Sequence, residues 1–510
     1  MGLFFVFQGD FWTDENWYYA GSWAFAKGRL PHVDFFIHHN PLVFYVYGLV
    51  QKTVGPSLLV GRLQSFVLWF LSLVLLCRIG RRVGGRWAGV LFLVLAITNP
   101  FSVRFFNTFS WRPLEAFLLA LALTFLCADW SPRIRYPLVV AVLTLEVGLR
   151  YLIDLSSVLL LVFLIYVLVS QWRDKGVIAL SVAVAISGLV ILLLPYLILA
   201  RDQYLFDAAI YPLQMRTILR SFGLLSHLDS SIGRIINQVS LAQGSLTRFF
   251  AAGSLLIAVL AYNVHTFWLR PRGERLAWVH SRGEWWFFIL LYLILDEVLL
   301  VGSEVGTPVT RIVAFLLASL FISVESVRCC QSFQHIETRR QFVGMIILVL
   351  LVSPWLQSPQ EVGARARWSD SDVHRIRQAA RSIKAMTPPA STILSFYPAI
   401  VTEADRNVAL DMIMEVWGIF PTWDTKTSQS HHLVNIPMLL ASLDGGGPAA
   451  VVLTRPGRLE DDRGMGVLLK PYRDRIRSTI AARYTLAAAI PGPAVGYGVP
   501  ATVEVYLPRR

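Results

Sequence analysis

Apolar residues occur along most of the chain in long runs, which short polar clusters interrupt at regular intervals. Most of these runs have roughly 17 to 25 residues, the length that an α-helix needs to cross the hydrocarbon core of a bilayer. The pattern predicts a mainly α, polytopic membrane protein whose spanning helices pack as a bundle. We expect about ten spans, at residues 58–77, 86–103, 112–130, 136–150, 151–170, 176–199, 247–268, 284–302, 308–328 and 342–356.

The loops between the predicted spans differ in charge. Every second loop is basic, whereas the intervening short loops hold only Arg104, Arg112 and Arg150. Basic loops remain in the cytoplasm, so residues before 58, the 200–246 loop and everything after 356 are predicted to face outward. The basic series consists of Arg78, Arg81, Arg82, Arg86, Arg133, Arg135, Arg173, Lys175, Arg270, Arg272, Arg275, Arg282, Arg328, Arg339 and Arg340.

The outward N-terminal segment contains its own helical patterns. Residues 41–56 are apolar but include Gln51, Lys52 and Pro56, which favours a helix lying on the membrane over a crossing one. The eight residues from Met1 to Gln8 are too few to cross a bilayer. We therefore expect a spanning helix ahead of the printed start, with residues 1–8 as its tail. An outward N-terminal tail is the alternative.

The composition changes near residue 357. A helical pattern covers about Ser371 to Met386 and ends at Thr387-Pro388-Pro389, and short β-branched runs follow at 391–397, 449–454 and 502–507. These elements predict a small α/β domain outside the membrane. The chain is thus divided into an outward loop with amphipathic helices (1–57), a membrane domain (58–356) and an extracytoplasmic α/β domain (357–510). His431-His432 is interpreted as a solvent-exposed pair.

Composition supports a membrane protein and excludes other classes. Hydrophobic residues make up 55% of the chain, charged residues 15%, and the mean hydropathy is +0.56. The net charge of +13 is spread over short clusters between apolar runs, so it does not indicate nucleic-acid binding. The four cysteines, Cys77, Cys127, Cys329 and Cys330, show no metal-ligand spacing and are predicted to be inert thiols.

The outward N-terminal segment also holds the most informative polar residues. An acidic pair, Asp14-Glu15, is followed by the aromatic Trp17-Tyr18-Tyr19, then by Pro31-His32-Val33-Asp34-Phe35 and His38-His39-Asn40-Pro41-Leu42. This order resembles the first external loop of the GT-C membrane glycosyltransferases. The resemblance is to the bacterial relatives of protein O-mannosyltransferases (glycosyltransferase family 39) and to the lipid A aminoarabinose transferases. It implies a polyprenyl-phosphate-linked sugar as donor; the acceptor, whether lipid, glycan or protein, stays open.

The resemblance implies roles for the acidic residues of this loop. Asp14 matches the catalytic aspartate, which would remove the proton of the acceptor hydroxyl, and Glu15 would position the acceptor or orient the loop. The alternative is that Asp14 only caps the helix that begins there. Asp34 matches the second acid of the loop and could bind sugar hydroxyls, or serve as a local turn residue.

The leaving phosphate requires a cation or a hydrogen-bond donor. Among the outward cations we favour Arg62 and Arg150 over Arg104 and Arg112, which could instead pair with nearby acids. His38 and His39 could donate to phosphate or, with Asp34, ligate a divalent metal, although burial at an interface explains them equally well. The sequence therefore leaves metal dependence open.

Two other functions fit a polytopic chain with charges near its spans. One is a transporter or flippase, although we find neither the internal repeats nor the interrupted helices typical of transporters. The other is a non-catalytic scaffold that retains a GT-C fold. A membrane glycosyltransferase remains the favoured interpretation because the loop pattern combines acids, aromatics and prolines in one order.

Overall fold

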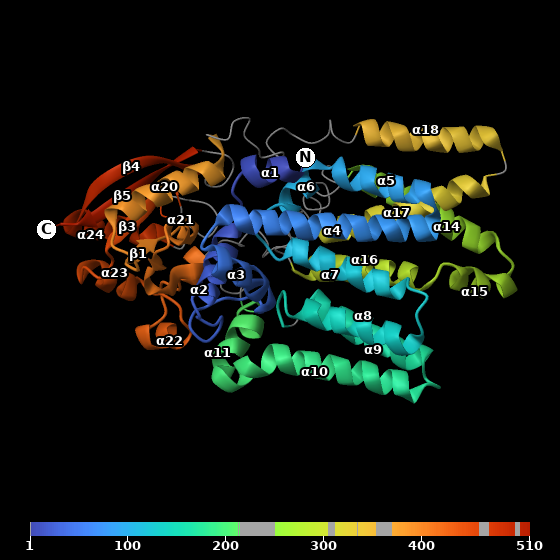
Figure 1. The fold of residues 1–510 in the computed structure, drawn as a ribbon, viewed down its shortest axis with the longest axis horizontal. Helices are drawn as coiled ribbons and strands as arrows, with labels where there is room; N and C mark the ends of the chain where they lie inside the picture. Colours follow the sequence, from blue (N-terminus) through green and yellow to red (C-terminus); the bar gives the residue numbers. More distant parts are fainter. Residues whose placement is uncertain are drawn as a thin grey trace.

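The computed structural model describes residues 2–152, 154–212, 214, 250–303, 312–333, 335–352, 370–457, 459, 469–494 and 500–509. A long bundle of roughly antiparallel helices forms one part, and a smaller α/β unit packs against one end of it (Figure 1). The chain is therefore mainly α with a C-terminal mixed sheet, as the hydrophobic pattern predicts.

Each of the ten predicted spans overlaps a helix within the described residues, and these helices differ in how much of their surface is exposed. Helix α17 is largely buried among its neighbours, whereas α10 lies at the periphery with most of its side chains exposed. Within the described residues, α4, α10 and α17 are long and apolar enough to cross a membrane. The ten helices are α4 (Leu58–Gly84), α5 (Arg86–Ile97), α7 (Arg112–Leu126), α8 (Pro132–Val147), α9 (Leu155–Ser170), α10 (Lys175–Leu199), α14 (Phe250–Leu269), α16 (Glu284–Ser303), α17 (Ile312–Ser332) and α18 (Ile336–Val352).

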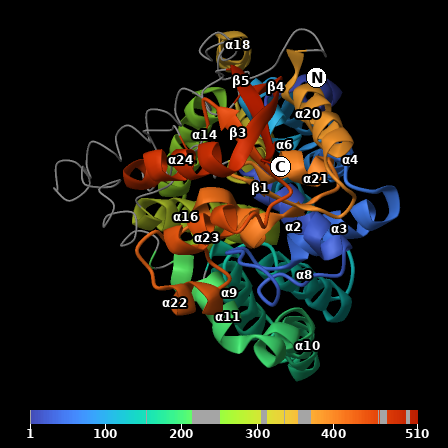
Figure 2. The same cartoon turned by 90° about the vertical axis from the view of Figure 1, so that its left-hand side faces the viewer.

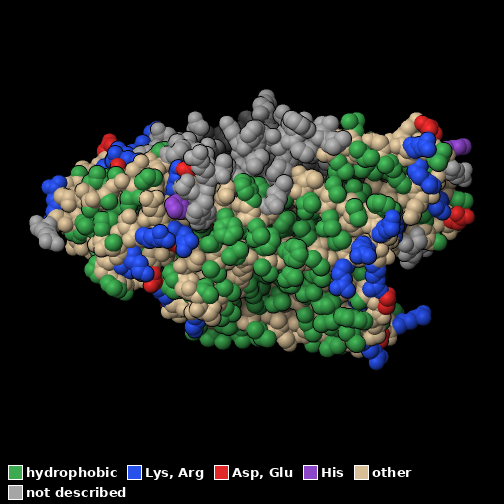
Figure 3. All heavy atoms as spheres, turned by 45° about the horizontal axis from the view of Figure 1, so that its top comes forward, with side chains coloured by type: hydrophobic (Ala, Val, Ile, Leu, Met, Phe, Trp, Pro, Cys, Tyr) green, Lys and Arg blue, Asp and Glu red, His purple; other side chains and the backbone are tan. Residues whose placement is uncertain are grey.

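The surface of the bundle supports an integral membrane protein. Hydrophobic side chains cover the middle of the face in Figure 3, and Lys and Arg gather toward its two ends. An apolar band between charged ends is what a bilayer requires of the protein surface that it contacts. The short helix α15 (Arg272–Ser281) lies at the end of the bundle opposite the α/β unit (Figure 1).

The structure corrects two boundaries inside the bundle. The predicted span 86–103 is broken, because Asn99 caps a new helix, α6 (Pro100–Phe106), that starts with proline. The predicted junction at residue 150 is a loop between α8 and α9, where the Asp154 side chain accepts a hydrogen bond from Leu155 N. The sequence thus predicted the second break and missed the first, where apolar residues continue on both sides of Asn99-Pro100.

The N-terminal segment folds into three helices at the end of the bundle that meets the α/β unit. They are α1 (Gly2–Gln8), α2 (Glu15–Ala26) and α3 (Leu42–Val54), and the last confirms the helix predicted at 41–56. One face of α3 is buried through Val43, Phe44 and Tyr47 while Lys52 is exposed. After α10, the short helix α11 (Arg201–Leu205) and the π-helix η1 (Phe206–Ile210) turn back toward this segment.

The C-terminal α/β unit, residues 370–509, contains a five-stranded mixed sheet. The strand order is β2-β1-β3-β5-β4, with β1 parallel to β2 and β3, and β5 antiparallel to β3 and β4. The prediction found α20, β1, β3 and β5 but missed β2 and β4. The elements are α20 (Asp372–Met386), β1 (Thr392–Ser395), α21 (Pro398–Glu403), β2 (Asn407–Val408), η6 (Ala409–Gly418), α22 (Thr425–Ser430), α23 (Ile436–Asp444), β3 (Ala450–Arg455), α24 (Arg473–Arg483), β4 (Tyr484–Ala494) and β5 (Pro500–Pro508).

The α/β unit packs directly on the N-terminal helices, with α20 and α21 near α1 and α2 (Figures 1 and 2). His431 belongs to this contact. Its ring stacks on Phe206 of η1 at a centroid distance of 4.0 Å, and its Nδ1 lies 3.2 Å from Gln203 Oε1. The prediction that this histidine is solvent-exposed is therefore wrong, because it assumed a free loop where a second element covers the ring.

Candidate active site

The acidic pair lies where the N-terminal loop enters α2. Asp14 is the residue that precedes the helix, yet its side chain makes no capping hydrogen bond. Glu15, the first helical residue, is fully buried. Adjacent residues on a helix diverge by about 100°, so the two carboxylates face different surroundings.

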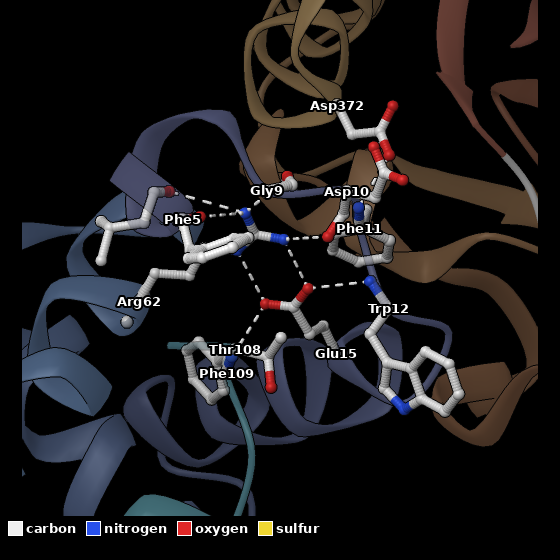
Figure 4. A network of polar contacts seen from close by, with 12 residues as sticks. Phe5, Gly9, Asp10, Phe11, Trp12, Glu15, Arg62, Thr108, Phe109 and Asp372 are labelled. Atoms are coloured by element: carbon white, nitrogen blue, oxygen red, sulfur yellow. Dashed lines mark hydrogen bonds and ion pairs between the residues drawn. The ribbon is translucent and has the colours of Figure 1, made fainter. Parts of the chain in front are cut away.

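Glu15 is held in a buried pair with Arg62 of α4 (Figure 4). Arg62 Nε donates to Glu15 Oε1 at 2.8 Å, and Arg62 Nη2 donates to Oε2 at 2.6 Å. Each oxygen also accepts a backbone N–H, Oε1 from Phe109 at 2.8 Å and Oε2 from Trp12 at 2.9 Å. The remaining Arg62 donors bind the carbonyl oxygens of Phe5, Val6, Gly9 and Asp10.

This pair corrects two expectations from the sequence. Arg62 has its guanidinium donors engaged inside the protein and is only 1% exposed, so it does not present them to a lipid phosphate. Glu15 likewise uses both carboxylate oxygens to hold the loop, α4 and the α6–α7 connection together. Glu15 was expected either to position the acceptor or to orient the loop, and these contacts agree with the second role.

Asp14 faces a different arginine, Arg112, the first residue of α7. Asp14 Oδ2 lies 3.7 Å from Arg112 Nη2, which is an ion pair rather than a hydrogen bond. The Asp14 side chain is 23% exposed and that of Arg112 only 5%. Two further guanidinium nitrogens of Arg112, Nε and Nη1, are buried and have no hydrogen-bond partner. A buried guanidinium with unsatisfied donors is a strong site for an anion.

Two histidines and three tyrosines form a cluster near this ion pair. His39 Nε2 lies 3.0 Å from the Tyr18 hydroxyl, and the His38 ring stacks against Tyr151 and Tyr211 at 5.5 and 5.6 Å between centroids. Burial lowers the pKa of His38 to about 3, and burial together with nearby cations holds the pKa of His39 well below its usual value. Both rings are therefore neutral near pH 7, and their buried Nδ1 atoms have no hydrogen-bond partner.

No family model and no curated protein sequence matches the chain. The structure matches ArnT from Cupriavidus metallidurans, in the crystal form bound to undecaprenyl phosphate, with a TM-score of 0.59 at 11% identity. That match covers 99% of this chain and 96% of that chain. The apo form of the same ArnT gives a TM-score of 0.58 at 12% identity, over 99% of this chain and 95% of that one.

The chain has the GT-C membrane glycosyltransferase fold. At this level of identity the likeness is one of fold. Archaeal oligosaccharyltransferase AglB from Archaeoglobus fulgidus, in complex with an inhibitory peptide and a dolichol-phosphate, gives a TM-score of 0.49 at 10% identity, over 99% of this chain and 71% of that one.

Within this GT-C fold, Arg150 is committed to acids. Arg150 forms two ion pairs, in which its Nε lies 2.6 Å from Asp154 Oδ2 and its Nη1 lies 3.5 Å from Glu115 Oε1. Its guanidinium also lies over the Trp111 ring, 4.5 Å from the centroid, on which Arg112 packs as well at 5.0 Å. The sequence analysis favoured Arg62 and Arg150 as phosphate ligands, but both are paired with acids inside the protein. Arg112, beside Asp14, has two nitrogens without a hydrogen-bond partner and is the better candidate.

Asp34 forms a local turn. Its Oδ2 accepts from Leu30 N at 2.6 Å, and Arg29 donates to its backbone carbonyl. This geometry agrees with the turn alternative rather than with sugar binding. In the part of the GT-C chain that the structure describes, no three His, Cys, Asp or Glu side chains come close enough to hold a metal ion, so the proposed grouping of His38, His39 and Asp34 is not formed.

The residues that sequence reasoning undervalued in this candidate site are Arg112, Tyr18 and Tyr151. One signal was available for Arg112, because a cation at the end of an apolar span is rarely retained without a polar partner. Tyr18 and Tyr151 carried no such signal. Aromatic residues are common near a membrane interface, and only the fold places these two beside Asp14 and His39.

Proposed function

We propose that this protein is a membrane glycosyltransferase that moves a sugar from a polyprenyl-phosphate donor to an acceptor hydroxyl. The observation that carries the proposal is the Asp14–Arg112 pair, a partly exposed carboxylate beside a buried guanidinium with two unsatisfied nitrogens. The GT-C fold and the undecaprenyl phosphate named with the ArnT structure support this donor class. The acceptor, lipid, glycan or protein, is left open.

The proposed reaction uses the two side chains in different steps. Asp14 takes the proton of the acceptor hydroxyl as its oxygen forms a bond to the anomeric carbon. The bond between that carbon and the phosphate oxygen breaks, and the electron pair leaves with the polyprenyl phosphate. Arg112 stabilises the charge on this leaving group through Nε and Nη1, the two buried nitrogens without a hydrogen-bond partner. His38 and His39 would act as neutral hydrogen-bonding groups.

The arrangement in the membrane is part of the proposal. The basic series of loops supports an orientation with the Asp14 segment and the α/β unit on the outer face of the cell membrane. Residues 1–57 would then form the outer loop, 58–356 a membrane domain with about ten spans, and 357–510 an extracytoplasmic domain. In this orientation the acceptor approaches from outside and the prenyl chain of the donor stays in the bilayer.

A transfer assay with purified protein and a panel of polyprenyl-phosphate sugars tests the proposal. We expect Asp14→Asn to lower the rate about 100-fold or more, since a general base contributes roughly that much. Arg112→Gln should lower both the transfer rate and the binding of undecaprenyl phosphate. Asp129→Asn is the matched control, because Asp129 is 93% exposed in a surface pair with Arg82.

Two outcomes would contradict the proposal. Full transfer activity in Asp14→Asn would show that Asp14 is not the catalytic base. Wild-type protein that carries the lipid-linked sugar across a vesicle membrane, with its phosphate bond intact and no transfer, would favour the transporter alternative.

A further inference from the structure

Two carboxylates of the C-terminal α/β unit, the fully buried Asp372 and the largely buried Glu403, contact the helical part of the chain on either side of Asp14. Asp372, in the first turn of α20, contacts the chain before Asp14, and Glu403, at the end of α21, contacts the chain after it. Asp372 is 361 residues away from its contact Phe11, and Glu403 is 384 residues away from its contact Tyr19. Neither belongs to the Asp14–Arg112 pair itself.

Asp372 joins the loop to the sheet. Its Oδ2 accepts a hydrogen bond from Phe11 N at 2.7 Å, and its Oδ1 accepts one from Ala494 N at 2.7 Å, at the end of β4. The side chain is fully buried, and Figure 4 shows it next to the Glu15–Arg62 network. Phe11 is three residues ahead of Asp14, so this carboxylate fixes the backbone that leads to the proposed base.

Glu403 joins α2 to the start of α4. Its Oε2 accepts from the Tyr19 hydroxyl at 2.5 Å and from Leu58 N at 2.8 Å. These two helices also carry Glu15 and Arg62, so Glu403 adds a second link between the elements that their ion pair joins. A third contact, Ala399 N to Asn16 Oδ1 at 3.2 Å, lies between the first two.

The need to hold the α/β unit against the N-terminal segment does not by itself explain why buried carboxylates lie at this contact. Apolar contacts such as Phe11 against Tyr397, at 5.5 Å between ring centroids, would hold the unit in place without the desolvation that a carboxylate requires. Hydrogen bonds that a buried carboxylate accepts are directional, so they fix one position of the N-terminal segment relative to the α/β unit. At the rim, the exposed pair Lys27–Asp405 adds little to that geometry.

We propose that Asp372 and Glu403 are positioning residues, and that the α/β unit uses them to hold Asp14 in the orientation that transfer requires. This inference rests on the proposed function. It assigns the α/β unit a part in forming the active site, acting through Phe11 and Tyr19 rather than through contact with substrate. A displacement of the base by about 1 Å is enough to lower a rate roughly 100-fold.

The test uses full-length protein with two isosteric changes. Asp372→Asn leaves one oxygen and places an amide N–H against a backbone N–H, and Tyr19→Phe removes only the hydroxyl that binds Glu403. Asp405→Asn is the control, because it changes a carboxylate of the same unit at the exposed rim. For each variant we measure kcat and the donor KM, and we count working sites by the stoichiometry of bound undecaprenyl phosphate.

The expected result is a fall in kcat per working site of roughly 10- to 100-fold in both variants, with donor KM and stoichiometry unchanged. Asp405→Asn should match the wild type. A loss of working sites with unchanged kcat per site would overturn the inference, since it would show a role in folding only. The inference would also be overturned if both variants had the same kcat per working site as Asp405→Asn. Failure of the proposed function gives a different pattern, in which the wild type is no more active than Asp14→Asn.

Discussion

At the residue scale, two neighbouring acids differ because the helix turns them toward different arginines. Glu15 makes four hydrogen bonds to Arg62, Phe109 and Trp12 and lies out of contact with solvent. Asp14 stays partly exposed at 3.7 Å from Arg112. Only Asp14 is partly exposed, so only its carboxylate can be reached by an incoming hydroxyl.

We predict that Glu15→Gln destabilises the protein by about 3 to 5 kcal/mol, because it leaves the buried guanidinium of Arg62 without its counter-ion. The measurement is thermal unfolding in detergent, with Asp129→Asn as the exposed-pair control. If Glu15→Gln instead unfolds like the wild type and loses transfer, then Glu15 takes part in the chemistry and our assignment is incorrect.

At the element scale, close packing around α4 places the Glu15–Arg62 pair. Ser57 caps this helix by accepting from Val60 N, and Gly61 follows one turn later. A Cβ at Gly61 would lie 1.9 Å from Phe109 Cδ2, so the helix approaches the α6–α7 connection as closely as it does because residue 61 has no side chain. The same Phe109 donates its backbone N–H to Glu15.

Gly61→Ala should therefore destabilise the protein by about 1 to 3 kcal/mol, although alanine is the better helix former, because the Phe109 ring must move. Gly344→Ala in α18 is the matched control, since a Cβ there meets no atom within 4 Å. It should unfold at the same temperature as the wild type or slightly higher. Equal midpoints for the two variants would contradict the close approach at Gly61.

Sequence patterns at this scale predicted helices better than their interruptions. Periodic apolar residues identify a helix locally, whereas the break at Asn99-Pro100 is a short polar signal inside apolar surroundings. Strand β4 was missed for a related reason. It is an edge strand rich in alanine and proline, and proline is accepted there because the outer edge needs no ladder donor.

At the scale of the whole molecule, the α/β unit and the helical bundle share a buried polar contact at Asp372. Burial raises the pKa of Asp372 to about 6, because loss of hydration outweighs the hydrogen bonds from Phe11 and Ala494. The folded protein thus binds this proton more tightly than the unfolded chain, whose value is near 3.8. The stability that the protonated group contributes is fully present below that value and is lost as the pH rises through about 6.

We therefore predict that the difference in unfolding free energy between wild type and Asp372→Asn changes by up to about 3 kcal/mol between pH 4 and 7, moving against the wild type as the pH rises. Denaturant unfolding of the two proteins at matched pH values measures this difference. Asp405→Asn provides the reference for a rim carboxylate. A difference that does not vary with pH would show that Asp372 is not held as a buried, titrating group.

Sequence by itself determined the class of this protein, most of its helices and the segment that carries its candidate chemistry. These properties depend on composition, on local periodicity and on the residue order of one short loop, all of which are present before the chain folds. The resemblance of that loop to GT-C enzymes depends only on its residue order, and the fold confirmed the resemblance.

Tertiary structure alone decided which charged groups pair and which remain available. Glu15 and Arg62 are 47 residues apart, and Asp372 and Phe11 are 361 apart, so no local pattern relates them. An arginine on the outward side could bind an acid or a phosphate with equal ease on the basis of its residue type. Burial and distance make the choice, since a guanidinium surrounded by acceptors is satisfied, and Arg112, with two unsatisfied nitrogens beside Asp14, is not.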